Sequence, residues 1–94
     1  MKHFEIHPGS YLAEELEELG ISISQAAREM GIPANRLSQI VNEKRGISAD
    51  TALRLARWLG TSANLWMNLQ VAYDLAKAER EKGAEIEALP TRAA

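Results

Sequence analysis

Residues 22–42 predict two short helices joined by a tight turn, and this pattern constrains the fold more than any other stretch. Ser22 suits a helix N-cap, and Gln25 follows it at the capping-box spacing. Gly31 lets the chain reverse with a positive φ, and Pro33 suits the entry to a second helix. Apolar residues recur at helical spacing in both segments, as Ile23, Ala26, Ala27 and Met30 and then as Leu37, Ile40 and Val41. The stretch therefore predicts a helix-turn-helix.

The outer face of the second motif helix is polar and carries no carboxylate. It holds Ala34, Asn35, Arg36, Ser38 and Gln39. Asparagine and glutamine amides can pair with adenine, arginine pairs with guanine, and a serine hydroxyl can form hydrogen bonds with several base edges. We therefore predict that these five residues read DNA bases in the major groove. The alternative is a helical hairpin whose polar face is simply solvated.

The charge distribution favours a nucleic-acid partner although the formal net charge is −2. Residues 28–57 hold six lysines and arginines against three acidic residues, whereas residues 1–20 hold one lysine against five glutamates. The positive charge is thus concentrated on the segment that contains the motif, as a phosphate-binding surface requires. Lys44 and Arg45 directly follow the second motif helix, where they would reach flanking phosphates or form an ordinary charged turn.

Length and composition exclude several other classes of protein. A chain of 94 residues predicts one domain, and the absence of cysteine excludes a disulfide framework or a thiolate metal site. No apolar run is long enough for a membrane span and no signal peptide is recognisable, so we expect a cytoplasmic protein with no membrane partner. We expect His3 and His7 to be solvent-exposed rather than metal ligands. No catalytic constellation is present, so we expect no enzyme, no metal and no cofactor.

Three further helices are predicted around the motif. They span Ser10–Leu19, Ala49–Leu59 and Ala63–Lys82, and Gly83 is expected to end the last one. In the first of these, Leu12, Leu16 and Leu19 are expected to face inward. Residues 1–7 would form an arm and residues 84–94 a polar tail, so we expect one all-α domain over residues 1–83.

The last predicted helix carries two apolar stripes. The first consists of Leu65, Leu69, Ala72 and Ala76, together with Trp66 and Tyr73. The second consists of Met67, Val71 and Leu75. One stripe suffices to pack the helix onto a small domain, and a second exposed stripe would form a patch that monomers rarely carry. We therefore predict a homodimer that forms through the second stripe, and the alternative is one broad buried face.

Three parts of the chain resemble a known family. The segments HPGSYLAEEL, GIPANRLSQIVNEKRGISADTALRLARWLGTSANLWMNLQVAYDL and PTRAA resemble the HigA-type (VapI-like) antitoxins of the phage-repressor-like helix-turn-helix superfamily. The resemblance implies a five-helix, lambda-repressor-like domain that forms a homodimer and binds operator DNA. It also implies a partner from the same operon, a small basic RelE-like RNase toxin that cuts mRNA on the ribosome. The antitoxin would sequester this toxin and repress the shared promoter.

The sequence departs from this family at both motif helices. Many relatives open the first motif helix with a glutamine that contacts a phosphate, and Ile23 stands there in this chain. We therefore expect Ser24 or Gln25 to supply that contact, with Asn42, Lys44 and Arg45 as the remaining backbone contacts. Pro33 replaces the usual polar N-cap of the second helix, which leaves N–H groups there for phosphate or water.

The acidic N-terminal segment is our candidate for the toxin surface. An acidic helix would steer a basic partner and leave the base-reading helix free for DNA. We predict that this surface comprises Glu14, Glu15, Glu17 and Glu18, with Phe4 and Ile6 as apolar anchors. The simpler interpretation is a solvated acidic face. Two alternative functions are a stand-alone helix-turn-helix repressor without a toxin and an interaction module that has lost DNA binding.

Overall fold

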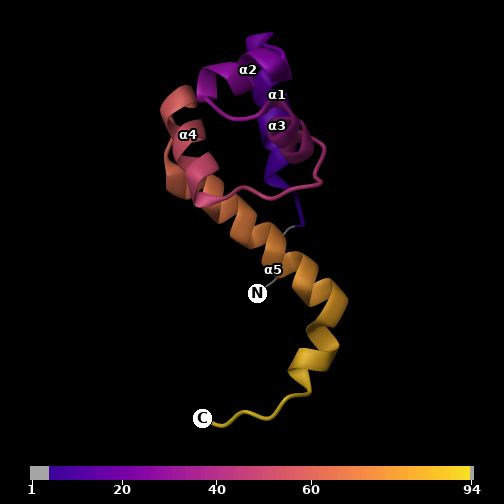
Figure 1. Ribbon diagram of the computed structural model, residues 1–94. Coiled ribbons are helices and arrows are strands. Elements are labelled where there is room, and N and C mark those ends of the chain that lie inside the picture. The colour runs from indigo at the N-terminus through magenta and orange to yellow at the C-terminus, as the bar shows by residue number, and fades with distance from the viewer. Residues whose placement is uncertain (1–4, 94) are drawn as a thin grey trace.

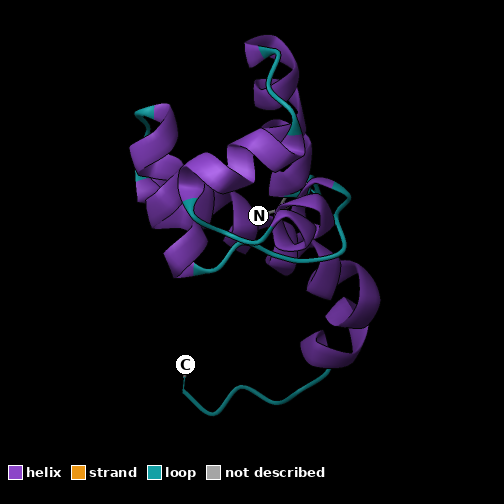
Figure 2. Cartoon of the chain, turned by 45° about the horizontal axis from the view of Figure 1, so that its top comes forward, coloured by secondary structure: helices purple, strands orange, loops and turns teal. Residues whose placement is uncertain are grey.

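The computed structural model describes residues 5–93, which form five α-helices and no strand. In chain order these are α1 (Pro8–Leu19), α2 (Ile23–Met30), α3 (Ala34–Val41), α4 (Ala49–Leu59) and α5 (Ala63–Glu87). Helices α1 to α4 lie together at one end of the molecule, and α5 runs away from them as a long rod (Figure 1). Only loops join the helices (Figure 2). The prediction of an all-α, five-helix domain is confirmed.

The helix ends follow from local sequence signals. Serine hydroxyls accept backbone N–H groups at the starts of α2, α4 and α5. Ser22 accepts from Gln25, Ser48 from Thr51 and Ser62 from Leu65. These hydroxyls satisfy N–H groups that have no partner within the helix. The predicted bounds of α4, Ala49–Leu59, are therefore reproduced without a shift.

The hydrophobic core lies where α1 to α4 meet the first turns of α5. Its buried side chains include Leu12, Leu16, Ala26, Ala27, Leu37, Ile40, Ile47, Ala52, Leu55 and Trp66. Because α2 and α3 both contribute to this core, their mutual orientation is fixed by packing rather than by the turn alone. The motif is thus a rigid platform for whatever its outer face binds.

Helix α1 differs from its prediction at both ends. It begins at Pro8 rather than Ser10, because the imidazole of His7 acts as the N-cap and accepts the backbone N–H of Gly9 at 2.9 Å. At the other end Leu19 is 50% exposed, so the expectation that it faces inward was wrong. Leu19 stands beside Gly20, where the chain turns away, so no neighbouring helix covers it.

Helix α5 continues past its predicted end. Gly83 was expected to stop it, yet the helix runs to Glu87 and Gly83 lies inside it. Gly83 is not among the residues with positive φ, so the chain does not use its freedom to turn there. The second half of α5 extends beyond the other helices (Figure 1), and the described part of the molecule measures 50 × 21 × 21 Å.

Candidate nucleic-acid interface

The turn between α2 and α3 is closed by backbone hydrogen bonds. Gly31 ends α2 in the left-handed region at φ 70°, which an L-residue with a side chain rarely adopts. The N–H of the buried Ile32 then bonds the carbonyl of Ala27 at 3.0 Å. At the start of α3, Pro33 provides no side-chain cap, and its carbonyl accepts the N–H groups of Arg36 and Leu37. The helix-turn-helix geometry predicted for residues 22–42 is therefore present.

Helix α3 divides into an inner apolar face and an outer polar face. Leu37 and Ile40 are buried in the core. Of the five predicted base-reading residues, Ala34 and Asn35 are exposed, whereas Arg36, Ser38 and Gln39 are half-buried. The helix therefore presents a continuous polar surface to solvent without a carboxylate of its own. Such a surface can donate and accept hydrogen bonds at base edges.

Two predicted contacts at the end of α3 are already engaged with neighbouring side chains. The Arg45 Nε donates to Gln39 Oε1 at 2.8 Å. The Asn42 amide donates to the carbonyl of Ser38 at 2.9 Å and to its hydroxyl at 3.3 Å. Asn42 therefore helps to cap its own helix, while Gln39 and Arg45 form one hydrogen-bonded unit across α3 and the following turn.

The remaining predicted phosphate contacts differ in their freedom. Ser24 and Lys44 are exposed. The Gln25 amide instead donates to Glu29 at 2.9 Å, and Glu29 also accepts the indole N–H of Trp58 at 2.9 Å. That indole hydrogen bond, followed by the one from Gln25, lowers the pKa of Glu29. Ser24 is therefore the freer of the two residues that we considered at the start of α2.

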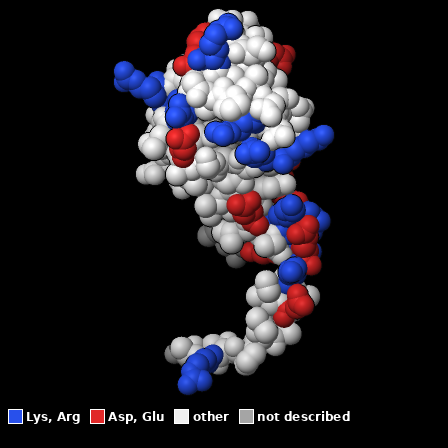
Figure 3. All heavy atoms as spheres, in the orientation of Figure 1, with Lys and Arg blue, Asp and Glu red and all other residues white. Residues whose placement is uncertain are grey.

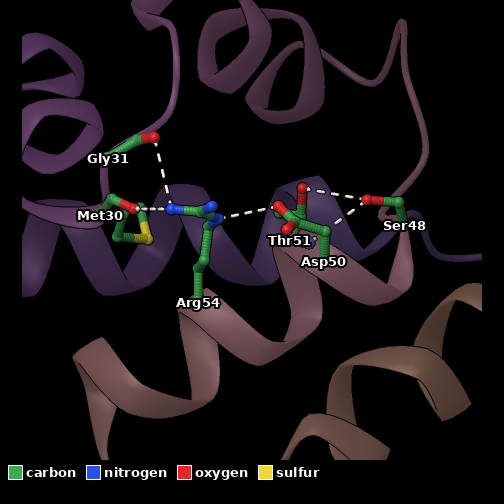
Figure 4. Close-up of polar contacts among 6 residues, drawn as sticks. All are labelled: Met30, Gly31, Ser48, Asp50, Thr51 and Arg54. Atoms are coloured by element: carbon green, nitrogen blue, oxygen red, sulfur yellow. Dashed lines mark hydrogen bonds and ion pairs between the residues drawn. The ribbon is translucent and has the colours of Figure 1, made fainter.

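Arg54 in α4 holds the turn of the motif, a role that the sequence did not reveal (Figure 4). Its Nη1 donates to the carbonyl of Met30 at 2.9 Å and to that of Gly31 at 3.4 Å, and its Nε pairs with Asp50 at 2.8 Å. These carbonyls lie at the end of α2, where a helix leaves acceptors without partners. We counted Arg54 toward the basic surface, but its guanidinium serves this cap.

Basic side chains nevertheless spread over the helix-turn-helix end of the molecule. On the face drawn in Figure 3, several lysine and arginine side chains lie across the upper body beside a few acidic groups, and acidic and basic groups alternate along α5. Lys44 and Arg45 belong to this basic surface, and both are exposed beside the end of α3. The polar face of α3 is thus bordered by cations, an arrangement suited to a polyanion.

His7 is a second residue whose role sequence reasoning missed. It is only 4% exposed, so the expectation of a solvent-exposed histidine was wrong, while His3 lies outside the described residues. Its ring meets that of Tyr73 edge to face at a centroid distance of 4.8 Å. Burial lowers the pKa of His7, although the carboxylates of Glu43 and Asp74 act in the opposite direction. No group of three or more potential metal-binding side chains gathers anywhere in residues 5–93.

The buried amide of Gln70 ties α5 to the turn that follows α3. Its Oε1 accepts the N–H of Ile47 at 2.6 Å, and its Nε2 donates to Asp74 at 3.0 Å. Gly46 packs directly against this amide, since a β-carbon there would lie 2.9 Å from Gln70 Nε2. The turn that carries Lys44 and Arg45 is therefore anchored at its far end.

The predicted dimer stripe is partly exposed. Met67 packs against the core and is half-buried, whereas Val71 is 49% and Leu75 is 45% exposed. Leu65, which we placed on the first stripe, is also exposed. The alternative of one broad buried face does not fit these exposures. Val71 and Leu75, which lie one helical turn apart, thus form an apolar strip that remains uncovered along α5.

The predicted toxin-contact residues lie on the open surface where the structure describes them. Glu14, Glu15, Glu17 and Glu18 are all exposed on α1, and none forms an ion pair with another residue in the described range 5–93. Ile6 is exposed as well, and Phe4 lies outside the described residues. No helix in residues 5–93 is both long and apolar enough to span a membrane.

Comparison with known proteins gives consistent matches. A helix-turn-helix family model matches residues 12–66. Virulence-associated protein I of Dichelobacter nodosus is 49% identical over 78 residues, which cover 82% of this chain and 72% of that protein. The solved structure of an addiction module antidote protein of the HigA family from Coxiella burnetii is 47% identical. It superposes with a TM-score of 0.91 over 99% of this chain and 100% of that one. Pseudomonas aeruginosa antitoxin HigA, solved with the higBA promoter, is 44% identical with a TM-score of 0.91 over 97% and 100% of the two chains.

Proposed function

Because the chain belongs to the helix-turn-helix family and, within it, to the HigA-type antitoxins, we propose that it is the antitoxin of a type II toxin–antitoxin pair. It would repress its own operon as a homodimer and neutralise a RelE-like toxin that cleaves mRNA. The observation that carries this proposal is the outer face of α3, which is polar, free of carboxylates and bordered by Lys44 and Arg45. Its task would be binding rather than catalysis.

Operator recognition would divide between α3 and its flanks. The side chains of Ala34, Asn35, Arg36, Ser38 and Gln39 would enter the major groove and read base edges. Backbone phosphates would be held by Lys44 and Arg45 and, at the start of α2, by Ser24, with Gln25 free to join if it leaves Glu29. Asn42 would contact phosphate only when one of its two N–H groups leaves Ser38.

A homodimer would cover the apolar strip on α5. Val71 and Leu75 would pack against the same residues of the second copy around a two-fold axis, with Met67 at the edge of the contact. Such symmetry would set the two α3 helices about 34 Å apart, one turn of DNA, and would require a palindromic site. Dimerisation would remove the exposed apolar side chains of this strip from water.

The toxin would bind the acidic face of α1. An RNA-cleaving toxin carries positive charge to hold phosphates, and four exposed glutamates offer it a complementary surface. These are Glu14, Glu15, Glu17 and Glu18, and Ile6 with Phe4 would add apolar contact. Because α1 contributes none of the base-reading residues, one dimer could hold the toxin and the operator together.

Co-expression tests the antitoxin function. The chain should co-purify with the product of a short reading frame directly beside its gene, and it should suppress mRNA cleavage by that product. The double variant Glu14→Lys and Glu18→Lys should associate with this partner more slowly, most of all at low salt, and should still bind the promoter. The matched control is Glu85→Lys with Glu87→Lys, which makes the same charge change at the far end of α5.

Two outcomes would contradict parts of the proposal. Equal association rates for the α1 variant and the control would place the toxin contact elsewhere on the chain. Promoter binding by a chain whose neighbouring reading frames encode no toxin would identify a stand-alone repressor.

A further inference from the structure

We propose that Arg45 is a specificity-determining residue, because it fixes how Gln39 presents its amide to a base. This inference rests on the DNA-binding function proposed above and goes beyond the phosphate contact expected of Arg45. Gln39 lies on the outer face of α3, and Arg45 lies six residues later in the turn. Their side chains meet through a hydrogen bond of 2.8 Å from Nε of Arg45 to Oε1 of Gln39.

The chemistry of the pair determines which end of the amide faces outward. A guanidinium can only donate hydrogen bonds, so the amide atom that meets it must be the oxygen. The Gln39 Nε2 then carries two N–H groups that remain free to donate. A glutamine without this partner can turn its amide and pair with adenine through both ends. The Arg45 bond occupies one of the two lone pairs of Oε1 and directs the oxygen toward the turn, so the amide is no longer free to turn.

The resulting unit favours guanine. With Oε1 of Gln39 directed toward Arg45, the amide presents Nε2, which only donates. Guanine offers two adjacent acceptors in the major groove, N7 and O6, whereas adenine offers one acceptor beside a donor. We therefore expect guanine at the base that faces Gln39, and a shift toward adenine when Arg45 is removed.

The turn holds Arg45 in place before DNA arrives. The N–H of Lys44 bonds the carbonyl of Gln39 at 2.8 Å, so the turn closes back onto the end of α3. Glu43 adopts a positive φ of 62° to allow this closure. Beyond Arg45, the N–H of Ile47 is fixed by Gln70 at 2.6 Å. A group preorganised in this way loses little freedom on binding, which is what discrimination between bases requires.

The conservative variant Arg45→Lys separates positioning from phosphate binding. Lysine keeps the positive charge but has no Nε–H donor at the position that meets Gln39. Promoter duplexes carrying each of the four bases, at the position where Gln39→Ala relaxes the preference, would be titrated with both proteins. We expect Arg45→Lys to reduce the preference for guanine about fivefold or more. The affinity of the variant for scrambled DNA is measured alongside, because it reports any loss of the phosphate contact separately from the loss of base preference.

Two further variants complete the test. In the Gln39→Ala background, Arg45→Lys should cause no additional loss of discrimination, because the amide that it positions is gone. Lys44→Ala is the control for a phosphate contact and should weaken all duplexes alike. Unchanged base preference in Arg45→Lys would overturn the inference, but the proposed operator-binding function would still stand. An unaltered chain that prefers no sequence at all would overturn both the inference and the proposed DNA-binding function.

Discussion

Arg54 in α4 donates from Nη1 to the carbonyl of Met30 at 2.9 Å, so a residue of the fourth helix caps the last turn of the second. The two residues are 24 positions apart in the chain. The same guanidinium reaches Asp50 through Nε, which orients its plane. The end of α2, where the turn to α3 begins, is therefore held by α4, although α4 contributes none of the predicted base-reading residues.

Removal of this cap should destabilise the fold. We expect Arg54→Met to lower the free energy of unfolding by about 1 kcal/mol, because carbonyls at the end of α2 lose a charged donor. We expect a small loss of stability for a charged donor, because the Arg54 side chain is 42% exposed and water replaces part of the hydrogen bond. Urea denaturation measures it, with Arg57→Met as a control for the lost charge in the same helix. Equal effects of the two variants would show that the cap contributes nothing.

Gly9 lies where α1 passes very close to the backbone of α3. A β-carbon at Gly9 would overlap the carbonyl oxygen of Ile40, which is backbone and cannot turn aside. We expect Gly9→Ala to cost about 1–3 kcal/mol through overpacking. Gly83→Ala is the matched control, since a β-carbon there meets only Glu79 at 4.0 Å and should stabilise α5 by about 0.5–1 kcal/mol. Thermal unfolding of both proteins checks this, and a Gly9→Ala variant as stable as the parent would refute the packing argument.

The burial of His7 predicts a dependence of stability on pH. Its pKa in the folded chain lies below the ordinary value of 6.5, because burial disfavours the charged ring. Between these two values the unfolded chain binds more protons, so the free energy of unfolding should fall as the pH drops through about 6.5. The pKa values of Glu5 and Glu29 are lowered from 4.5 and affect a more acidic range.

His7→Asn isolates this contribution. Asparagine is a good N-cap and can accept the Gly9 N–H, but it does not titrate near neutral pH. We expect unfolding free energies measured by urea denaturation from about pH 7.5 to 5.5 to decline in the parent and to stay nearly level in the variant. The same decline in both proteins would assign the effect to other groups.

The exposed strip on α5 predicts a dimer that a single charge disrupts. Val71→Glu would place like charges close together across a two-fold contact, and we expect a dissociation constant raised at least about tenfold. Leu19→Glu is the control, because Leu19 is exposed to the same extent, 50% against 49%, at the end of α1. Analytical ultracentrifugation over a range of concentrations measures both. A dimer unaffected by Val71→Glu would exclude Val71 from the contact.

The sequence predicted the parts of the structure that local signals encode. Ser22 and Gly31 mark the ends of α2 through a cap and a reversal, and both patterns lie within a few residues. Gly83 misled this reasoning because glycine ends a helix only where a positive φ is used, and the lysine, alanine and glutamate residues around it are good helix formers. A local pattern cannot show whether a permissive residue uses its freedom.

The missed residues share contacts between distant parts of the chain. Gln70 accepts a hydrogen bond from Ile47, which lies 23 positions away in the chain. The ring of His7, before α1, contacts that of Tyr73 in α5. Periodicity gives the face on which such a residue lies but not its partner. The pairing of Gln39 with Arg45 was hidden for a related reason. Both residues were predicted at the interface, but in separate roles. Their contact requires the turn after α3, and that turn depends on the positive φ of Glu43, which the sequence pattern did not predict.

The central claim is that the outer face of α3 reads the chain's own promoter, and one titration tests it most directly. Affinities for promoter DNA and for a scrambled duplex are measured at several salt concentrations for the unaltered chain, Gln39→Ala and Lys44→Ala. We predict that Gln39→Ala weakens promoter binding by about 1–3 kcal/mol and leaves the scrambled duplex nearly unaffected. Lys44→Ala should weaken both and lower the salt slope by about one. If Gln39→Ala weakened the promoter and the scrambled duplex equally, α3 would not be reading sequence and the account would be contradicted.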